Sequence, residues 1–216
     1  MNVPQRAMFI EEYGDILLLT GVVLYAAGLW VAFSQNIGTL AAVLAPGVAG
    51  TVYSLLRLKK VLLGKNIIVG LSWGAIPLLV GAYFSSHFST AVLVLFGFFS
   101  VGFFINTVIF DIKDIEGDTN EGVKTLPNTY GVEGTKTILH LVNVFLAAVT
   151  VILGILGVVP PSFLILLLFN SYVTIYILYA KQEQGPVFYG LFVDGECIFL
   201  AVAVILAYLV GGVDSI

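Results

Sequence analysis

Seven long runs of apolar residues, separated by short polar connections, are the feature that most constrains the fold of this 216-residue chain. A helix needs about 20 consecutive apolar residues to cross the hydrocarbon core of a bilayer. Only 10% of the residues are charged, against roughly a quarter in an average soluble domain. The sequence therefore predicts an all-α integral membrane protein, a single-domain bundle of about seven transmembrane helices over residues 1–216. The predicted spans are Ile16–Phe33, Ile37–Leu56, Ile67–Phe84, Phe88–Phe110, Ile138–Val158, Ser162–Ala180 and Val187–Val210.

The nine Lys and Arg residues all lie before the first span or in every second connection after it. Because cytoplasmic loops carry an excess of Lys and Arg, the pattern predicts a multi-pass protein of the cell membrane with a cytoplasmic N-terminus. Twelve of the thirteen acidic residues fall on the same side, although acidic residues contribute little to orientation. A functional site is therefore expected on the cytoplasmic side. The basic residues are Arg6, Arg57, Lys59, Lys60, Lys65, Lys113, Lys124, Lys136 and Lys181.

The longest polar connection carries Asp111, Asp114 and Asp118, at spacings of three and four residues. If the preceding helix continues through them, the three carboxylates line one helical face. Like charges this close repel one another unless a cation is bound, and Mg²⁺ usually binds through one or two carboxylates plus substrate phosphates. The spacing predicts a magnesium site, and a solvated acidic helix end is the alternative.

A basic segment on the same side has four cations within nine residues, Arg57 to Lys65. These cations either bind a diphosphate or simply orient the helix pair. A metal together with Lys and Arg is a common way of binding phosphate groups. The nearby carboxylates therefore favour the diphosphate interpretation.

Several segments resemble the UbiA-type intramembrane prenyltransferases, in order along the whole chain. DIKDIEGD at Asp111–Asp118, followed by GVKTLP at Gly122–Pro127, resembles the second aspartate-rich motif of that family. TVYSLLRLKKVLLGKN at Thr51–Asn66 resembles its tyrosine–lysine loop. NVPQR at Asn2–Arg6 resembles the stretch that follows its first aspartate-rich motif.

The resemblance implies Mg²⁺-dependent transfer of a polyprenyl group from a prenyl diphosphate to a lipophilic acceptor in the bilayer, with no nucleic-acid partner. It implies that Asp111, Asp114 and Asp118 hold the metal. The diphosphate contacts that it implies are Lys124, Lys59 and Lys60, with Arg57, Tyr53 and Asn66 as further candidates for the same clamp or for acceptor binding.

The family has nine helices, and this chain starts with residues that resemble those after the first aspartate-rich motif. We therefore expect that the first two helices and the first motif are missing, because the true start lies upstream or because a partner chain supplies them. Two other functions stay open. One is a non-catalytic isoprenoid- or lipid-binding membrane subunit, and the other is an ion-coupled transporter in which Asp194 carries a proton or ion.

The positions of two further sets of residues in the spans predict where they lie in the bundle. Asp194 and Glu196 lie in the last span, where a carboxylate at the bilayer centre costs about 2.5–3.5 kcal/mol. Either the helix begins late and both lie near the interface, or Asp194 lies at the mouth of the prenyl cavity. Phe104 and Gly97, seven and fourteen residues before Asp111, are expected along the prenyl chain.

Overall fold

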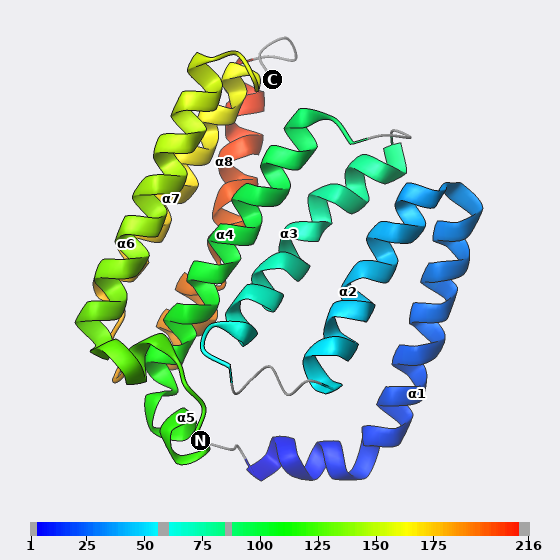
Figure 1. Ribbon diagram of the computed structural model, residues 1–216, viewed down its shortest axis with the longest axis vertical. Helices are drawn as coiled ribbons and strands as arrows, with labels where there is room; N and C mark the ends of the chain where they lie inside the picture. Colours follow the sequence, from blue (N-terminus) through cyan, green and yellow to red (C-terminus); the bar gives the residue numbers. More distant parts are fainter. Residues whose placement is uncertain (1–3, 56–60, 85–87, 212–216) are drawn as a thin grey trace.

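The computed structural model is a bundle of long helices, and it describes residues 4–55, 61–84 and 88–211 (Figure 1). Within these residues, seven helical stretches are long and apolar enough to span a membrane. The predicted all-α architecture with seven spans is therefore confirmed. The elements are α1 (Pro4–Gln35), α2 (Ile37–Leu55), α3 (Gly64–Phe84), α4 (Thr90–Lys113), α5 (Ile115–Asn120), α6 (Leu126–Ile155), η2 (Pro161–Ile165), α7 (Leu166–Tyr179), η3 (Phe188–Val193) and α8 (Glu196–Gly211).

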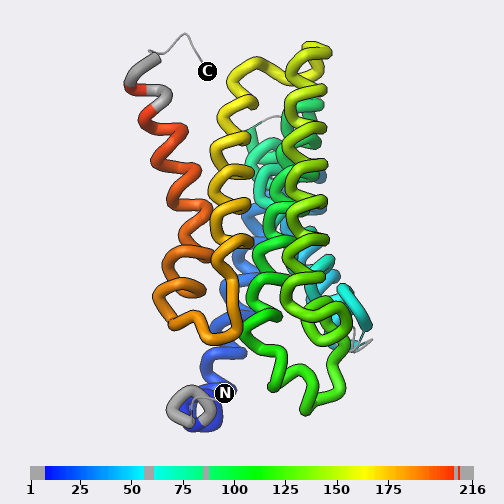
Figure 2. The backbone as a smooth tube through the Cα atoms, turned by 90° about the vertical axis from the view of Figure 1, so that its left-hand side faces the viewer, coloured from blue at the N-terminus to red at the C-terminus, as the bar shows by residue number. Residues whose placement is uncertain are grey.

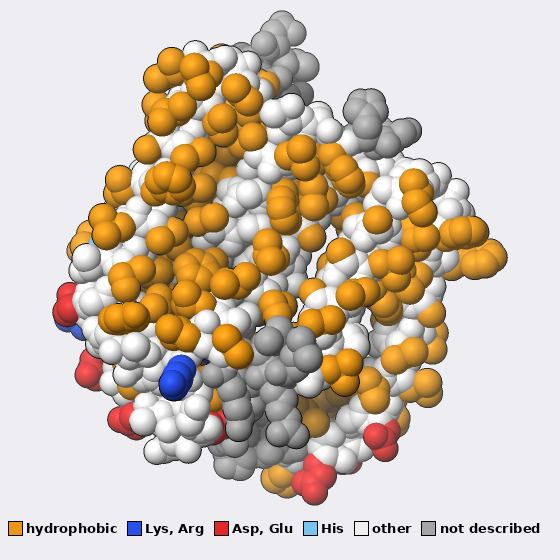
Figure 3. Space-filling view, viewed as in Figure 1, with side chains coloured by type: hydrophobic (Ala, Val, Ile, Leu, Met, Phe, Trp, Pro, Cys, Tyr) orange, Lys and Arg blue, Asp and Glu red, His pale blue; other side chains and the backbone are white. Residues whose placement is uncertain are grey.

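The long helices run up and down in alternation, with α1, α2, α3 and α4 side by side and α6, α7 and α8 beyond α4 (Figure 1). The ends of α2, α4 and α7 therefore meet the starts of α3, α6 and η3 at one end of the bundle, which we call the charged end. Charged side chains gather at this end, while the rest of the visible face is largely hydrophobic (Figure 3). The first turns of α1 run across the charged end, and α8 diverges from α7 toward the opposite end (Figure 2).

Glycines bring α3 unusually close to α4. A Cβ atom at Gly70 would lie 2.5 Å from the Ser100 carbonyl oxygen, and one at Gly74 would lie 2.9 Å from the Phe96 carbonyl oxygen. Such contacts are possible only without a side chain, and small residues serve this purpose in membrane helix packing. The close approach fixes the first turn of α3 against the last turns of α4.

The core lies around α4, α6, α7 and α8. Phe98 of α4 packs against Phe169 of α7 with ring centroids 5.4 Å apart, and Ile105, Ile109 and Val173 are fully buried in the same core cluster. α1 differs, because only 6% of its most apolar stretch is buried inside the bundle. A helix that is apolar on all sides and exposed in this way suits contact with lipid.

Two polar clusters join helices inside the bundle. Asn143 of α6 donates to the Asn170 carbonyl oxygen of α7 at 2.9 Å, and the Asn170 amide donates to Asn143 Oδ1 at 2.8 Å. These bonds pair both side-chain amide nitrogens, which would otherwise lie unpaired in an apolar environment. Hydrogen bonding between helices is a usual role of polar residues in spans.

Glu196 centres the second cluster and is fully buried. Its carboxylate accepts hydrogen bonds from Asn106 of α4 at 3.0 Å and from the Tyr176 hydroxyl of α7 at 2.8 Å. Asn106 also donates to the Val193 carbonyl oxygen at 3.3 Å, at the end of the π-helical η3. The α-helix therefore does begin late, after an exposed Asp194, but Glu196 lies inside the bundle.

Candidate functional site

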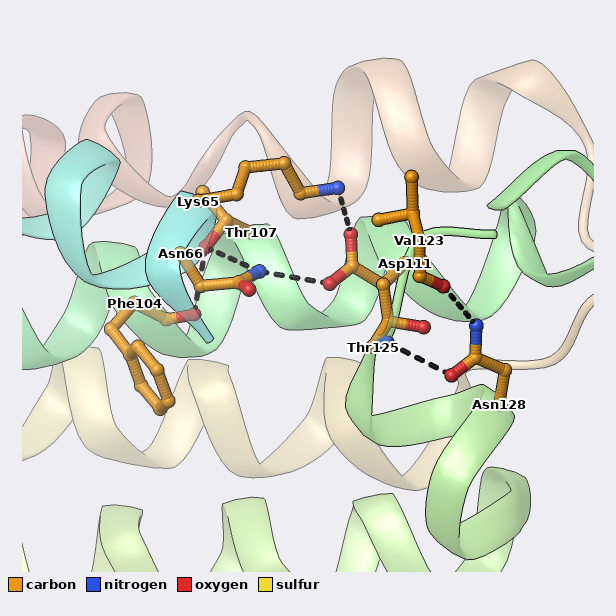
Figure 4. Close-up of polar contacts among 8 residues, drawn as sticks. All are labelled: Lys65, Asn66, Phe104, Thr107, Asp111, Val123, Thr125 and Asn128. Atoms are coloured by element: carbon orange, nitrogen blue, oxygen red, sulfur yellow. Dashed lines mark hydrogen bonds and ion pairs between the residues drawn. The ribbon is translucent and has the colours of Figure 1, made fainter. Parts of the chain in front are cut away.

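The candidate site lies at the charged end, where the first turn of α3 meets the last turn of α4 (Figure 4). Asp111 is 1% exposed. Its Oδ1 lies 2.5 Å from the Lys65 ammonium nitrogen, and its Oδ2 accepts a hydrogen bond from the Asn66 amide at 2.9 Å. Because each oxygen has a partner on α3, the carboxylate is held across the α3–α4 contact.

Asn66 is buried and links α3 to α4 a second time. Its amide nitrogen also donates to the Thr107 hydroxyl at 3.3 Å, and that hydroxyl donates to the Phe104 carbonyl oxygen at 2.9 Å. A neutral amide with two acceptors on one helix fixes the rotation of the Asp111 side chain. The predicted residue Asn66 therefore lies directly against the predicted residue Asp111.

The continuous helical face expected for Asp111, Asp114 and Asp118 is only partly present. α4 ends at Lys113, and Asp114 joins it to the short α5 with φ −98° and ψ 12°, outside the helical region. The Asp118 amide still donates to the Asp114 carbonyl oxygen at 2.9 Å, so the path stays nearly helical. The break leaves Asp111 buried, Asp114 exposed and Asp118 half-buried.

Asp118 has a carboxylate oxygen, Oδ2, that is buried and has no hydrogen-bond partner. Burial raises the pKa of the Asp118 carboxyl above its ordinary value; Lys65 opposes this rise, while the charges of Asp111 and Asp114 add to it. A buried, unpaired carboxylate oxygen is costly. It therefore marks a place where a bound cation would be stabilising.

Mg²⁺ fits these residues as a partner of two carboxylates rather than three. Among the described residues, no group of three or more His, Cys, Asp or Glu side chains is arranged to hold a metal. The expected three-aspartate site is not formed, because Asp114 turns outward at the helix break and Lys65 and Asn66 occupy Asp111. Asp111 and Asp118 still interact electrostatically, and two carboxylates plus substrate phosphates are a usual Mg²⁺ environment.

The turn after α5 is braced by one side chain. Asn128 accepts a hydrogen bond from the Thr125 amide at 2.8 Å and donates to the Val123 carbonyl oxygen at 2.7 Å. Gly122 has φ +68°, a conformation that side chains other than glycine rarely adopt. Lys124 is exposed in this turn, between the two backbone groups that Asn128 binds.

The remaining predicted ligands lie before α3. Tyr53 is half-buried near the end of α2 and interacts electrostatically with Lys65. Arg57, Lys59 and Lys60 lie outside the described residues. Lys65 was part of the basic segment but was not predicted as a ligand. Its position directly before the candidate Asn66 could have indicated that it belongs to the site.

The structure separates the two residues expected along the prenyl chain. Gly97 lines a hollow of about 280 Å³ between α4 and α6, with Val101 and Phe145 among its other walls. Phe104 is not among the residues that line it, and its Cβ lies close to Gly70 on α3. The hollow lies in the half of α4 away from the charged end.

Comparison with known proteins identifies the family. Residues 15–189, most of the chain, match the UbiA prenyltransferase family. No curated protein and no solved structure matches the chain. Membership of this family implies prenyltransferase activity in general. The match includes all the described residues of the candidate site. Because it covers most of the sequence, the chain belongs to the UbiA prenyltransferase family.

Proposed function

We propose that this protein transfers a polyprenyl group from a prenyl diphosphate to a lipophilic acceptor in the membrane, in a Mg²⁺-dependent reaction. The single observation that carries the proposal is the buried, unpartnered Asp118 oxygen, which interacts electrostatically with Asp111 and Lys65. The diphosphate is a strongly negative group on a long apolar chain. A site with metal-binding carboxylates at the charged end of an apolar bundle suits both parts of that molecule.

Asp111 and Asp118 would hold the metal through their carboxylates, and Asn66 would keep Asp111 in its orientation. Mg²⁺, when bound, acts as a Lewis acid that stabilises charge on the departing diphosphate. Lys124, an exposed cation on the braced turn, is a proposed contact of the diphosphate. Lys59, Lys60 and Arg57 remain proposed diphosphate contacts from the family resemblance.

Binding of labelled geranylgeranyl diphosphate to the purified chain in lipid, with and without Mg²⁺, tests the proposal. Asp118→Asn should weaken Mg²⁺-dependent binding at least about tenfold, because metal sites are sensitive to the loss of a single ligand. Glu116→Gln, which neutralises an exposed acid two residues away, should leave binding unchanged. Equal effects of the two substitutions would show that these acids form only a solvated surface.

A transfer assay with a panel of acceptors then separates catalysis from binding. Transfer of the labelled prenyl group supports the proposal. Mg²⁺-dependent binding without transfer to any acceptor would instead support an isoprenoid-binding membrane subunit. Running the assay with cell membranes added also tests for a partner chain that supplies further helices, which stays a prediction.

A further inference from the structure

Lys65 lies at the boundary between the buried carboxylate and the exterior. Its side chain is 32% exposed, whereas that of Asp111 is 1% exposed. Its ammonium nitrogen contacts Asp111 Oδ1 and also interacts electrostatically with Asp118 and Tyr53. One cation therefore faces both carboxylates that were assigned above to the metal, and it can reach outward.

The charges around this cation are unbalanced. Asp111 and Asp118 together carry two negative charges when ionised, and Lys65 is the cation that interacts with both within the part of the chain that the structure describes. A lysine ammonium is a compact charge on a flexible four-carbon stem, unlike the rigid fork of arginine. It can therefore move away from Asp111 while its backbone stays in α3.

Asn66 makes this movement possible without loss of the carboxylate's position. It holds Asp111 Oδ2 through a neutral amide, which has no charge to repel a metal ion. Lys65 holds the other oxygen through a full positive charge, which a divalent cation at the same oxygen would repel. The two neighbours on α3 thus differ: one contact is compatible with a bound metal, and the other is not.

We propose that Lys65 is the resting counter-ion of Asp111 and Asp118, that Mg²⁺ displaces it, and that the displaced ammonium group then binds the diphosphate. This inference rests on the proposed function, because it assumes a metal and a diphosphate at this site. Lys65 would compete with the metal before substrate arrives and attract the substrate afterwards. It would therefore weaken metal binding and strengthen diphosphate binding.

This dual role gives a test with two opposite signs, using the full chain in lipid nanodiscs. Binding of Mn²⁺ in place of Mg²⁺ is followed by electron paramagnetic resonance, with Mg²⁺ as competitor. Binding of inorganic pyrophosphate and of geranylgeranyl diphosphate is measured at saturating metal. Lys65→Met, which keeps the length of the side chain and removes its charge, should raise Mn²⁺ affinity and lower diphosphate affinity. Each change should be on the order of tenfold, the effect of one charge-assisted hydrogen bond.

Two further variants control the measurement. Lys181→Met removes an exposed lysine at the same end of the bundle and should leave both affinities unchanged. Lys65→Arg keeps the positive charge and should retain the weak Mn²⁺ binding of the wild type. It also provides a variant that does not leave the buried Asp111 without a cation.

Four outcomes would overturn the inference. If Lys65→Met lowers both affinities, Lys65 is a structural clamp. If it changes neither, Lys65 does not face the ligands. If Lys65→Arg binds Mn²⁺ as tightly as Lys65→Met, charge competition is not the cause. A wild-type chain that binds neither Mn²⁺ nor diphosphate would overturn the proposed function as well. If the wild-type chain binds both, a failure of the other tests concerns only the displacement of Lys65 by the metal.

Discussion

Gly70→Ala should disturb the candidate site, because Gly70 lies about one turn after Asn66 on α3. The new Cβ would lie 2.5 Å from the Ser100 carbonyl oxygen and 3.1 Å from the Phe104 amide nitrogen. Backbone atoms cannot rotate out of the way, so α3 must move from α4 by about 1 Å to reach an ordinary contact near 3.5 Å. The Asn66–Asp111 hydrogen bond, now 2.9 Å, would then exceed the usual range.

The magnitude follows from these two losses. Overpacking of this kind typically costs about 1–3 kcal/mol, and a hydrogen bond to a charged group contributes about 1.5–3 kcal/mol. We expect a lower midpoint of thermal unfolding in lipid nanodiscs. We also expect Mg²⁺-dependent binding of prenyl diphosphate to weaken about tenfold or more, since about 1.4 kcal/mol corresponds to a factor of ten.

Gly50→Ala is the matched control, because a Cβ atom at Gly50 of α2 has no neighbour within 4 Å. It makes the same chemical change in another spanning helix and should leave unfolding and binding close to wild type. If Gly70→Ala behaves like Gly50→Ala, the α3–α4 contact does not position Asp111. If it destabilises the protein but binding is unchanged, the contact supports the fold alone.

Three further predictions follow from the site, the buried cluster and the charge pattern. Burial raises the pKa of the Asp118 carboxyl above its ordinary value, and Mg²⁺ needs the ionised carboxylate. Isothermal titration should therefore show Mg²⁺ affinity falling as the pH is lowered through this raised pKa. Asp118→Asn should flatten that pH profile. Tyr176→Phe removes one of the two donors to the buried Glu196 and should lower the free energy of unfolding by about 1–3 kcal/mol, whereas Tyr179→Phe, at an exposed position, should not. Lys124→Cys should react with membrane-permeant but not with impermeant maleimide in intact cells, and labelling by the impermeant reagent would contradict the cytoplasmic assignment.

The spanning helices were predictable because the length of an apolar run is a direct requirement of the bilayer. The helix ends were less so: α1 begins at Pro4 rather than Ile16, and α6 begins at Leu126 rather than Ile138. Hydropathy marks the part of a helix that needs an apolar environment. Polar turns can continue the helix beyond it, because an α-helix satisfies its own backbone hydrogen bonds.

The periodicity of the sequence singled out site residues only within one segment, and Asn66 came from the family resemblance instead. Spacing along the chain brought out Asp111 and Asp118, but it did not reveal the break at Asp114. The pairing of Lys65 with Asp111 joins two helices across 46 positions, and no periodicity within either helix specifies it. Asp194 and Glu196 illustrate the same limit, since the sequence showed two acids in a span without showing which one faces the bundle.

The close packing of α3 on α4 also bears on how the protein enters the membrane. These two helices are consecutive, and Lys65, Asn66 and Asp111 all belong to them. A helical hairpin can therefore bring a lysine and an aspartate together at the charged end as a pair with no net charge, which costs less than burying the aspartate alone between the two helices. The ion pair would then form during synthesis, before the last three spanning segments exist, and its loss should first appear as poor packing within this hairpin.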